Sequence, residues 1–152
     1  MRRRTRYLLM LALALSCQWS GTPERPMLGA VPDLTATPVP LDPGDPKHLK
    51  VGALTFVGGV RLTSKDLAFG GYSSMTIDRG LFTLLSDGGT VVRFRLDDRF
   101  RLSAPGFGDL PVGPGTGWNK ADRDSESMTL DPATGSVWVG YERVNQIWRY
   151  SP

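Results

Sequence analysis

Acidic side chains at regular spacing are the clearest candidates for chemistry in this chain. Asp122, Asp124 and Glu126 occupy alternate positions in D-R-D-S-E. In an extended segment, alternate side chains point to the same side, so all three carboxylates would gather on one face. Such a concentration of negative charge favours a hard cation with oxygen ligands, such as calcium. A solvated acidic turn explains the same pattern equally well, and both interpretations stay open.

The acidic segment belongs to an internal repeat. D-S-E-S-M-T-L-D at residues 124–131 aligns with G-Y-S-S-M-T-I-D at residues 71–78. Further on, S-V-W-V-G-Y-E, ending at Glu142, aligns with L-F-T-L-L-S-D, ending at Asp87, and N-Q-I-W-R-Y aligns with G-T-V-V-R-F. Each unit therefore has three short β-prone runs separated by turns, with a carboxylate after the second run. A repeat period of about fifty residues without helical spacing predicts an all-β, propeller-like fold.

These motifs resemble a bacterial family named esterase-like activity of phytase. The similarity covers Leu49 to Tyr150 and depends on the order of G-G-Y-S-S-M-T-I-D, L-L-S-D-G-G, D-S-E-S-M-T-L-D, V-G-Y-E-R and Q-I-W-R-Y. The family consists of secreted β-propellers distantly similar to calcium-dependent phytases. One departure is Ser127, where the family more often has glycine. The resemblance implies calcium held by Asp124, Glu126 and Glu142, with Asp87 assisting.

Most other catalytic centres are excluded by residue content. His48 is the sole histidine and Cys17 the sole cysteine, which argues against a Ser-His-Asp triad, a cysteine nucleophile and a zinc site of cysteine and histidine. The segment G-Y-S-S-M lacks the second glycine of a nucleophile elbow. The acidic segment lacks the glycine and the final glutamate of an EF-hand. Carboxylate chemistry is what remains, with no single residue identified as catalytic.

The first seventeen residues have the pattern of an export signal. Four arginines precede an apolar run, Tyr7 to Ser16, that is too short to span a bilayer. Cys17 ends this run in A-L-S-C, which resembles a lipobox, although Ala14 stands where leucine is usual. We therefore expect an exported protein, either periplasmic or lipid-anchored through Cys17 at the bacterial envelope. Contact with the membrane is expected only through the signal peptide or the lipid.

Residues 18–48 are predicted to form a disordered, proline-rich linker. Prolines recur throughout this segment, large apolar residues are few, and His48 at its end is expected to be solvated. Four of the 18 basic residues precede Cys17, whereas all 15 acidic residues follow it, so residues 18–152 carry 14 basic and 15 acidic side chains. This balance gives no basic surface for nucleic acid, and no nucleic-acid partner is expected.

Residues 49–152 are predicted to hold the propeller-like units, at about 71–96 and 124–150. The intervening Asp97 to Lys120 is rich in glycine and proline, so we expect either a loop near a site or a disordered excursion. Its G-P-G-T-G-W-N-K lacks the ending of a P-loop. Basic residues around it would either bind an anion or form a solvated edge, the second being favoured: Arg95, Arg99, Arg101, Lys120 and Arg123.

Core packing is the expected role of the aromatic and methionine side chains in both units: Phe82, Phe94, Trp138, Trp148, Tyr150, Met75 and Met128. The segment Leu54 to Leu62 reads as a strand, interrupted by two glycines, that would complete the last blade of a ring. Two units are fewer than a closed propeller needs, so we expect a truncated or incomplete propeller that self-associates through open sheet edges.

Two function classes are consistent with the sequence. One is a calcium-dependent hydrolase of phosphoric esters, with this fragment inactive by itself. The other is a non-catalytic propeller for binding or scaffolding, in which the carboxylates tie turns together. The substrate of the first class would be a phosphate ester or another small molecule.

Overall fold

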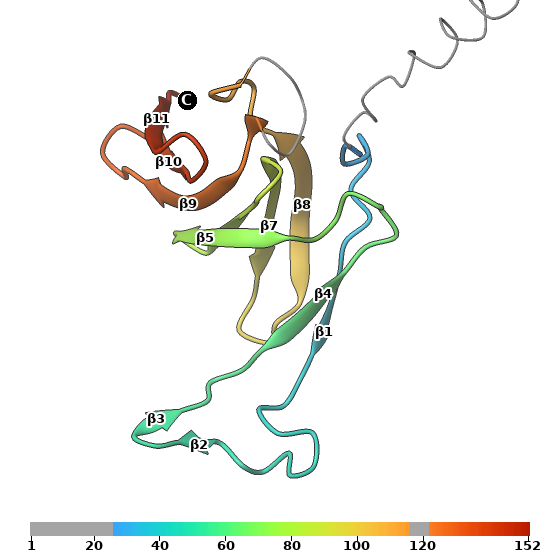
Figure 1. Ribbon diagram of the computed structural model, residues 1–152. Coiled ribbons are helices and arrows are strands. Elements are labelled where there is room, and N and C mark those ends of the chain that lie inside the picture. Colours follow the sequence, from blue (N-terminus) through green and yellow to red (C-terminus); the bar gives the residue numbers. More distant parts are fainter. Residues whose placement is uncertain (1–25, 116–121) are drawn as a thin grey trace, which may run out of the picture.

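The computed structural model describes residues 26–115 and 122–152, and over these residues the protein is all-β (Figure 1). Its strands form several antiparallel sheets, none of which closes on itself, and no α-helix occurs in the described ranges. Within the same ranges, no helix is long and apolar enough to cross a membrane. The leader, Cys17 and Lys120 lie outside the described residues.

The larger sheet contains four strands in sequential order: β5 (Tyr72–Asp78), β6 (Leu81–Ser86), β7 (Thr90–Leu96) and β8 (Leu102–Asp109). We call it the first sheet. The turn between β5 and β6 consists of Arg79 and Gly80, both with positive φ, at 47° and 77°. This combination is typical of a two-residue hairpin whose twist matches that of its strands.

The strand β8 corrects one sequence-based expectation. Residues 97–120 were expected to form a loop or a disordered excursion, but Leu102–Asp109 pairs with β7. Glycine and proline concealed this strand because both weaken the usual β pattern. The sheet accommodates them through a register shift opposite Arg93 and Arg95, beside Ala104 with a φ of 49°. The predicted three-stranded unit is therefore a four-stranded sheet.

The second sheet contains three strands, in the order β11-β10-β9. They are β9 (Ser125–Leu130), β10 (Val137–Tyr141) and β11 (Gln146–Tyr150). These strands coincide with the three runs predicted from the repeat. The paired residues Met75 and Leu84 in the first sheet correspond to Met128 and Val139 in the second. The two sheets therefore repeat one another in register as well as in sequence.

The two sheets pack against each other, with β5 beside β9 (Figure 1). The core between them contains buried Leu85, Leu110, Val139 and Tyr141, and Met128, Trp148 and Tyr150 pack around it. Leu84, Val92 and Phe94 point to the opposite face of the first sheet, where Leu28, Leu34 and Leu62 from the N-terminal part cover them. The first sheet is thus covered on both faces.

Two of the side chains expected in the core lie at the surface. Phe94 is buried and stacks on Phe82, with ring centroids 5.2 Å apart. Met75, in contrast, is 54% exposed, and Trp138 is exposed beneath the guanidinium of Arg149. Trp138 points to the face of the second sheet that no described strand covers, which is why its aromatic ring stays accessible.

The N-terminal part is more ordered than the sequence suggested. β1 (Thr35–Pro38) pairs with β4 (Val60–Thr63), and β2 (Lys50–Val51) pairs with β3 (Leu54–Thr55). The expected disorder of residues 18–48 is therefore wrong for β1, because a distant strand supplies its hydrogen-bond partners. The expected strand at Leu54 to Leu62 is divided between β3 and β4. Neither part pairs with either large sheet in the described residues, so ring closure by this segment is not seen.

Candidate metal site

Three carboxylates meet where β9 begins and β10 ends. Asp124 immediately precedes β9, Glu126 is its second residue, and Glu142 immediately follows β10. The register passes from Ser127 opposite Gly140 to Ser125 opposite Tyr141, which leaves Glu126 as the extra residue of a β-bulge. Beyond the bulge, the amide of Glu142 donates a hydrogen bond to the carbonyl of Asp124 at 3.1 Å. Main-chain pairing therefore holds all three residues together.

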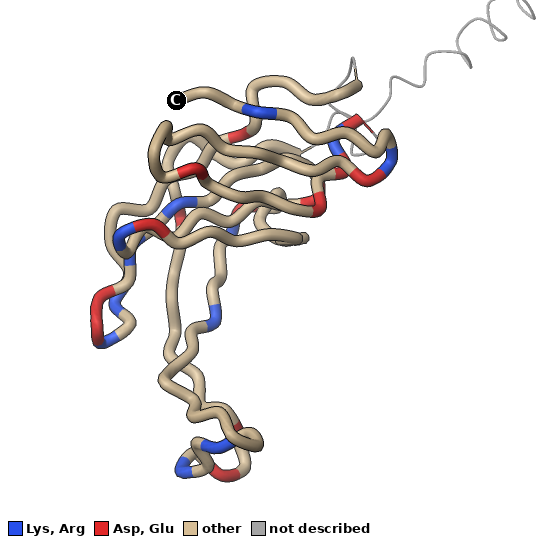
Figure 2. The backbone as a smooth tube through the Cα atoms, turned by 90° about the vertical axis from the view of Figure 1, so that its left-hand side faces the viewer, with Lys and Arg blue, Asp and Glu red and all other residues tan. Residues whose placement is uncertain are grey.

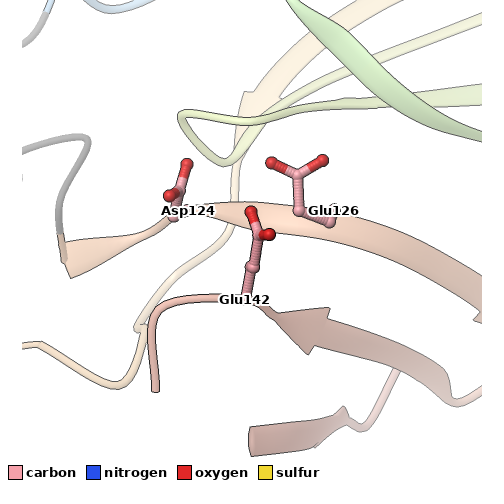
Figure 3. Close-up of side chains that lie close together, drawn as sticks. All are labelled: Asp124, Glu126 and Glu142. Carbon is pink, nitrogen blue, oxygen red and sulfur yellow. The ribbon is translucent and has the colours of Figure 1, made fainter. Parts of the chain in front are cut away.

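The three carboxylates project into the same space (Figure 3). One oxygen from each of Asp124, Glu126 and Glu142 lies within 4.8 Å of the others. Asp124 is buried, whereas the two glutamates are exposed. Two oxygens bound to one calcium ion lie at most about 5 Å apart, because each lies about 2.3 to 2.6 Å from the metal. The donor set and its spacing therefore fit a hard divalent cation whose remaining ligands are water or main-chain oxygens.

Arg143 is a member of this site that the sequence did not reveal. Its Nε donates to Oδ2 of Asp124 at 2.7 Å, while most of its side chain is exposed. Arg143 follows Glu142 in the turn between β10 and β11. Its place next to Glu142 in the V-G-Y-E-R motif was therefore the sequence feature that could have pointed to it. The guanidinium neutralises part of the negative charge and would compete with a metal ion for Asp124.

Ser125 anchors the carboxylates to the first sheet. Its side chain is fully buried, and its hydroxyl donates to the carbonyl of Ser86 at 2.7 Å. Its amide donates to the carbonyl of Asp87 at 3.1 Å, and its own carbonyl accepts from the hydroxyl of Ser73 at 2.6 Å. These hydrogen bonds fix the start of β9, so Asp124 and Glu126 are positioned by contacts between the sheets as well as within the second sheet.

Asp87, predicted to assist the other carboxylates, lies outside the group that they form. It occupies the position in the first sheet that Glu142 occupies in the second, since each follows the second strand of its repeat. The amide of Asp87 donates to the carbonyl of Gly71, as that of Glu142 does to Asp124. The carboxylate of Asp87 lies beside Gly71, where a Cβ would come within 3.0 Å of Oδ1. The carboxylate at this repeat position therefore lies beside a glycine in the first sheet and beside another carboxylate in the second.

Asp122 also lies outside the carboxylate group, although the alternating pattern included it. β9 begins at Ser125, so Asp122 is not in the extended segment that the pattern requires. Asp122, Asp124 and Arg143 line a small cavity of about 50 Å³, together with Tyr141. Burial raises the pKa of the Tyr141 hydroxyl, which forms a hydrogen bond with that of Tyr150, so Tyr141 remains neutral beside the site.

Three of the basic residues that were expected either to bind an anion or, as favoured, to form a solvated edge have structural partners. Arg95 donates from Nη1 to the carbonyl of Arg79 at 2.7 Å, and Arg101 donates from Nε to Asp97 at 2.6 Å. Arg123 is buried and donates to the carbonyl of Leu110. Figure 2 shows basic and acidic residues interspersed along the turns of the described backbone. The geometry therefore favours turn stabilisation over a shared anion site for these side chains.

Comparison with known proteins identifies a family. Neither a search of curated proteins nor a search of solved structures found a match. A family model described as "Phytase-like: Esterase-like activity of phytase" matches residues 67–152, more than half of the chain. The matched segment contains both large sheets and all three clustered carboxylates. The chain therefore belongs to the phytase-like family described by esterase-like activity of phytase.

Proposed function

We propose that this chain is an exported β-propeller-like protein that binds calcium and hydrolyses phosphoric esters. The observation that carries the proposal is the carboxylate cluster of Asp124, Glu126 and Glu142 inside the family match. Bound calcium would neutralise a phosphate ester and orient an attacking water. The apolar leader that precedes Cys17 supports export.

The direction of sheet packing supports adjacent propeller blades. Val139 of the second sheet packs against the first sheet. Its repeat equivalent in the first sheet, Leu84, packs against the N-terminal part. Leu85 faces the second sheet, and its equivalent Gly140 lies on the uncovered face. Each sheet thus presents the same face to the element that precedes it. Repeated stacking of this kind is how blades are added around a propeller axis.

Calcium titration of the full chain, with calorimetry and melting temperature as readouts, tests the cation site. We expect binding that removes the charge repulsion among the carboxylates and raises the melting temperature. Glu142→Gln should weaken calcium affinity by about tenfold or more, because it removes a charged ligand. Asp87→Asn is the matched control, since Asp87 has the equivalent place in the first sheet. Equal affinities of the two variants would contradict the site.

A second substitution tests the position of Arg143. Removing a cation 2.7 Å from Asp124 should increase calcium affinity, so Arg143→Gln is expected to bind several-fold more tightly. The control is Arg101→Gln, which removes an ion pair to Asp97 in the turn between β7 and β8. Unchanged affinity in Arg143→Gln would mean that the ion does not use Asp124.

A non-catalytic binding module is the second candidate function. The ion pair between Arg143 and Asp124 favours it, because a guanidinium already neutralises the buried carboxylate. Hydrolysis of a phosphomonoester and a carboxylester, each with and without a chelator, distinguishes the candidates. Turnover that requires calcium supports the hydrolase. No calcium response and no turnover would leave only the module.

A further inference from the structure

The main chain between two of the clustered carboxylates is attached to the first sheet on both sides of Ser125. Asp124 and Glu126 flank Ser125, so one peptide group links it to each of them. The amide of Ser125, which is linked to Asp124, donates to the carbonyl of Asp87 at 3.1 Å. The carbonyl of Ser125, which is linked to Glu126, accepts from the hydroxyl of Ser73 at 2.6 Å. The first sheet therefore orients both peptide groups beside these carboxylates.

Ser73 differs from the other first-sheet contacts of Ser125 because it contributes a side chain. Ser86 and Asp87 contribute main-chain carbonyls, which remain whatever residue occupies those positions. The hydroxyl of Ser73 also lies 3.3 Å from the carbonyl of Leu85. A hydroxyl has one proton to donate, and the contact with Ser125 at 2.6 Å is the shorter and stronger of the two. Substitution at Ser73 therefore removes one of these attachments selectively.

A β-bulge directs the hydroxyl of Ser73 towards the second sheet. In a regular strand, adjacent side chains point to opposite faces. Ser73 and Ser74 are adjacent, yet both bond to β9, since the hydroxyl of Ser74 accepts from the amide of Met128 at 2.8 Å. The register shift between Tyr72 and Ser74 leaves Ser73 as the extra residue, which releases it from the alternation. The bulge in one sheet thus supports the carboxylates of the next.

The carboxylates need such support because they repel one another. Their oxygens lie within 4.8 Å of each other, and two of the three side chains are exposed. Coulomb repulsion at this distance favours a wider arrangement when no cation is bound. A main chain fixed in the converging geometry leaves less ordering to be done when a cation binds, which strengthens binding.

We propose that Ser73 is a positioning residue for calcium bound by Asp124, Glu126 and Glu142. Its hydroxyl acts through the carbonyl of Ser125 and is not itself a ligand. This inference rests on the proposed calcium site, and it assigns part of that site's affinity to a side chain of the first sheet.

Calcium titration calorimetry of the full chain tests the assignment, at a temperature where every variant is folded. Ser73→Ala should weaken calcium affinity by about tenfold, the lower end of the effect of substitutions outside the ligand shell. Ser73→Thr keeps the hydroxyl on an exposed position and should bind calcium as tightly as the wild type. Failure of threonine to preserve the affinity would refute the role of the hydroxyl.

Ser74→Ala is the matched control. Like Ser73→Ala, it removes a short hydrogen bond between β5 and β9, but at Met128, two residues beyond Glu126. Both alanine variants should lower the melting temperature by similar amounts, and only Ser73→Ala should bind calcium less tightly. Unchanged affinity in Ser73→Ala, or equal weakening in both variants, would overturn this inference and leave the calcium site in place. A wild type that does not bind calcium would overturn the proposed function together with the inference.

Discussion

The first and second sheets share one main-chain arrangement but differ in the side chains that it presents. In both, a bulge lies near the start of the first strand, at Ser73 and at Glu126. In both, the amide of the residue after the second strand donates a hydrogen bond to the carbonyl of the residue that precedes the first strand. Asp87 donates to Gly71 in the first sheet, and Glu142 donates to Asp124 in the second. The backbone therefore prepares two equivalent places for converging side chains.

Several carboxylates converge at only one of these places. The second sheet has three carboxylates there, whereas the first has Gly71, Ser73 and a single carboxylate, Asp87. The hydroxyl of Ser73 bonds to Ser125, so it joins the sheets instead of contributing charge. The comparison shows that the repeat supplies a geometry, and that substitution within it determines whether several carboxylates converge there.

The largest expected difference between the sheets concerns their covered and uncovered faces. Leu85→Ala removes a fully buried side chain from the core between the sheets and should lower the free energy of unfolding by about 2 to 5 kcal/mol. Trp138→Ala, on the uncovered face of the second sheet, should cost less than about 1 kcal/mol. Chemical denaturation of both variants measures this. A large cost at Trp138 would indicate that another element covers that face.

A smaller effect is expected at the turn beside Asp87. Gly71 has a φ of 61°, and a Cβ there would come within 3.0 Å of Oδ1 of Asp87. Gly71→Ala should therefore lower the free energy of unfolding by about 1 to 2 kcal/mol. Gly106→Ala is the control, because its Cβ meets nothing within 4 Å. Similar stability in the two variants would show that the first sheet does not need glycine at this position.

The smallest effect concerns two equivalent aspartates at the end of the first strand of each repeat, Asp78 and Asp131. A hydrogen bond from the Thr134 hydroxyl, with a further one from the Ala133 amide, lowers the pKa of Asp131. A carboxylate with a lowered folded-state pKa stabilises the fold above its unfolded pKa, near 4, and loses that contribution as the pH falls through the folded value.

The corresponding test compares the melting temperatures of Asp131→Asn and the wild type from pH 7 to pH 2. The variant should be less stable than the wild type at pH 7, and the difference should disappear in acid. Asp78→Asn is the matched control, because Asp78 bonds to the exposed side chain of Arg79. A pH-independent difference for Asp131→Asn would mean that its charge does not stabilise the turn.

The sequence alone determined the all-β class, the internal repeat and most of the strands of both sheets. These features follow from local patterns, because alternating apolar runs and turn residues act over a few positions. β8 escaped this kind of prediction, since Pro105 and its neighbouring glycines disguise a strand that exists through pairing with β7. β1 escaped it for the same reason, because its partner β4 lies far along the chain.

The site divides in the same way. The sequence supplied Asp124, Glu126 and Glu142 through the repeat and through family resemblance, but only the tertiary structure excluded Asp87 and Asp122 from their group and added Arg143. The spacing of residues predicts which side of a strand a carboxylate faces. The bulge at Glu126 and the hydrogen bonds of Ser125 determine which other side chains that carboxylate lies beside. The spacing does not predict them, because those contacts join segments that are distant in sequence.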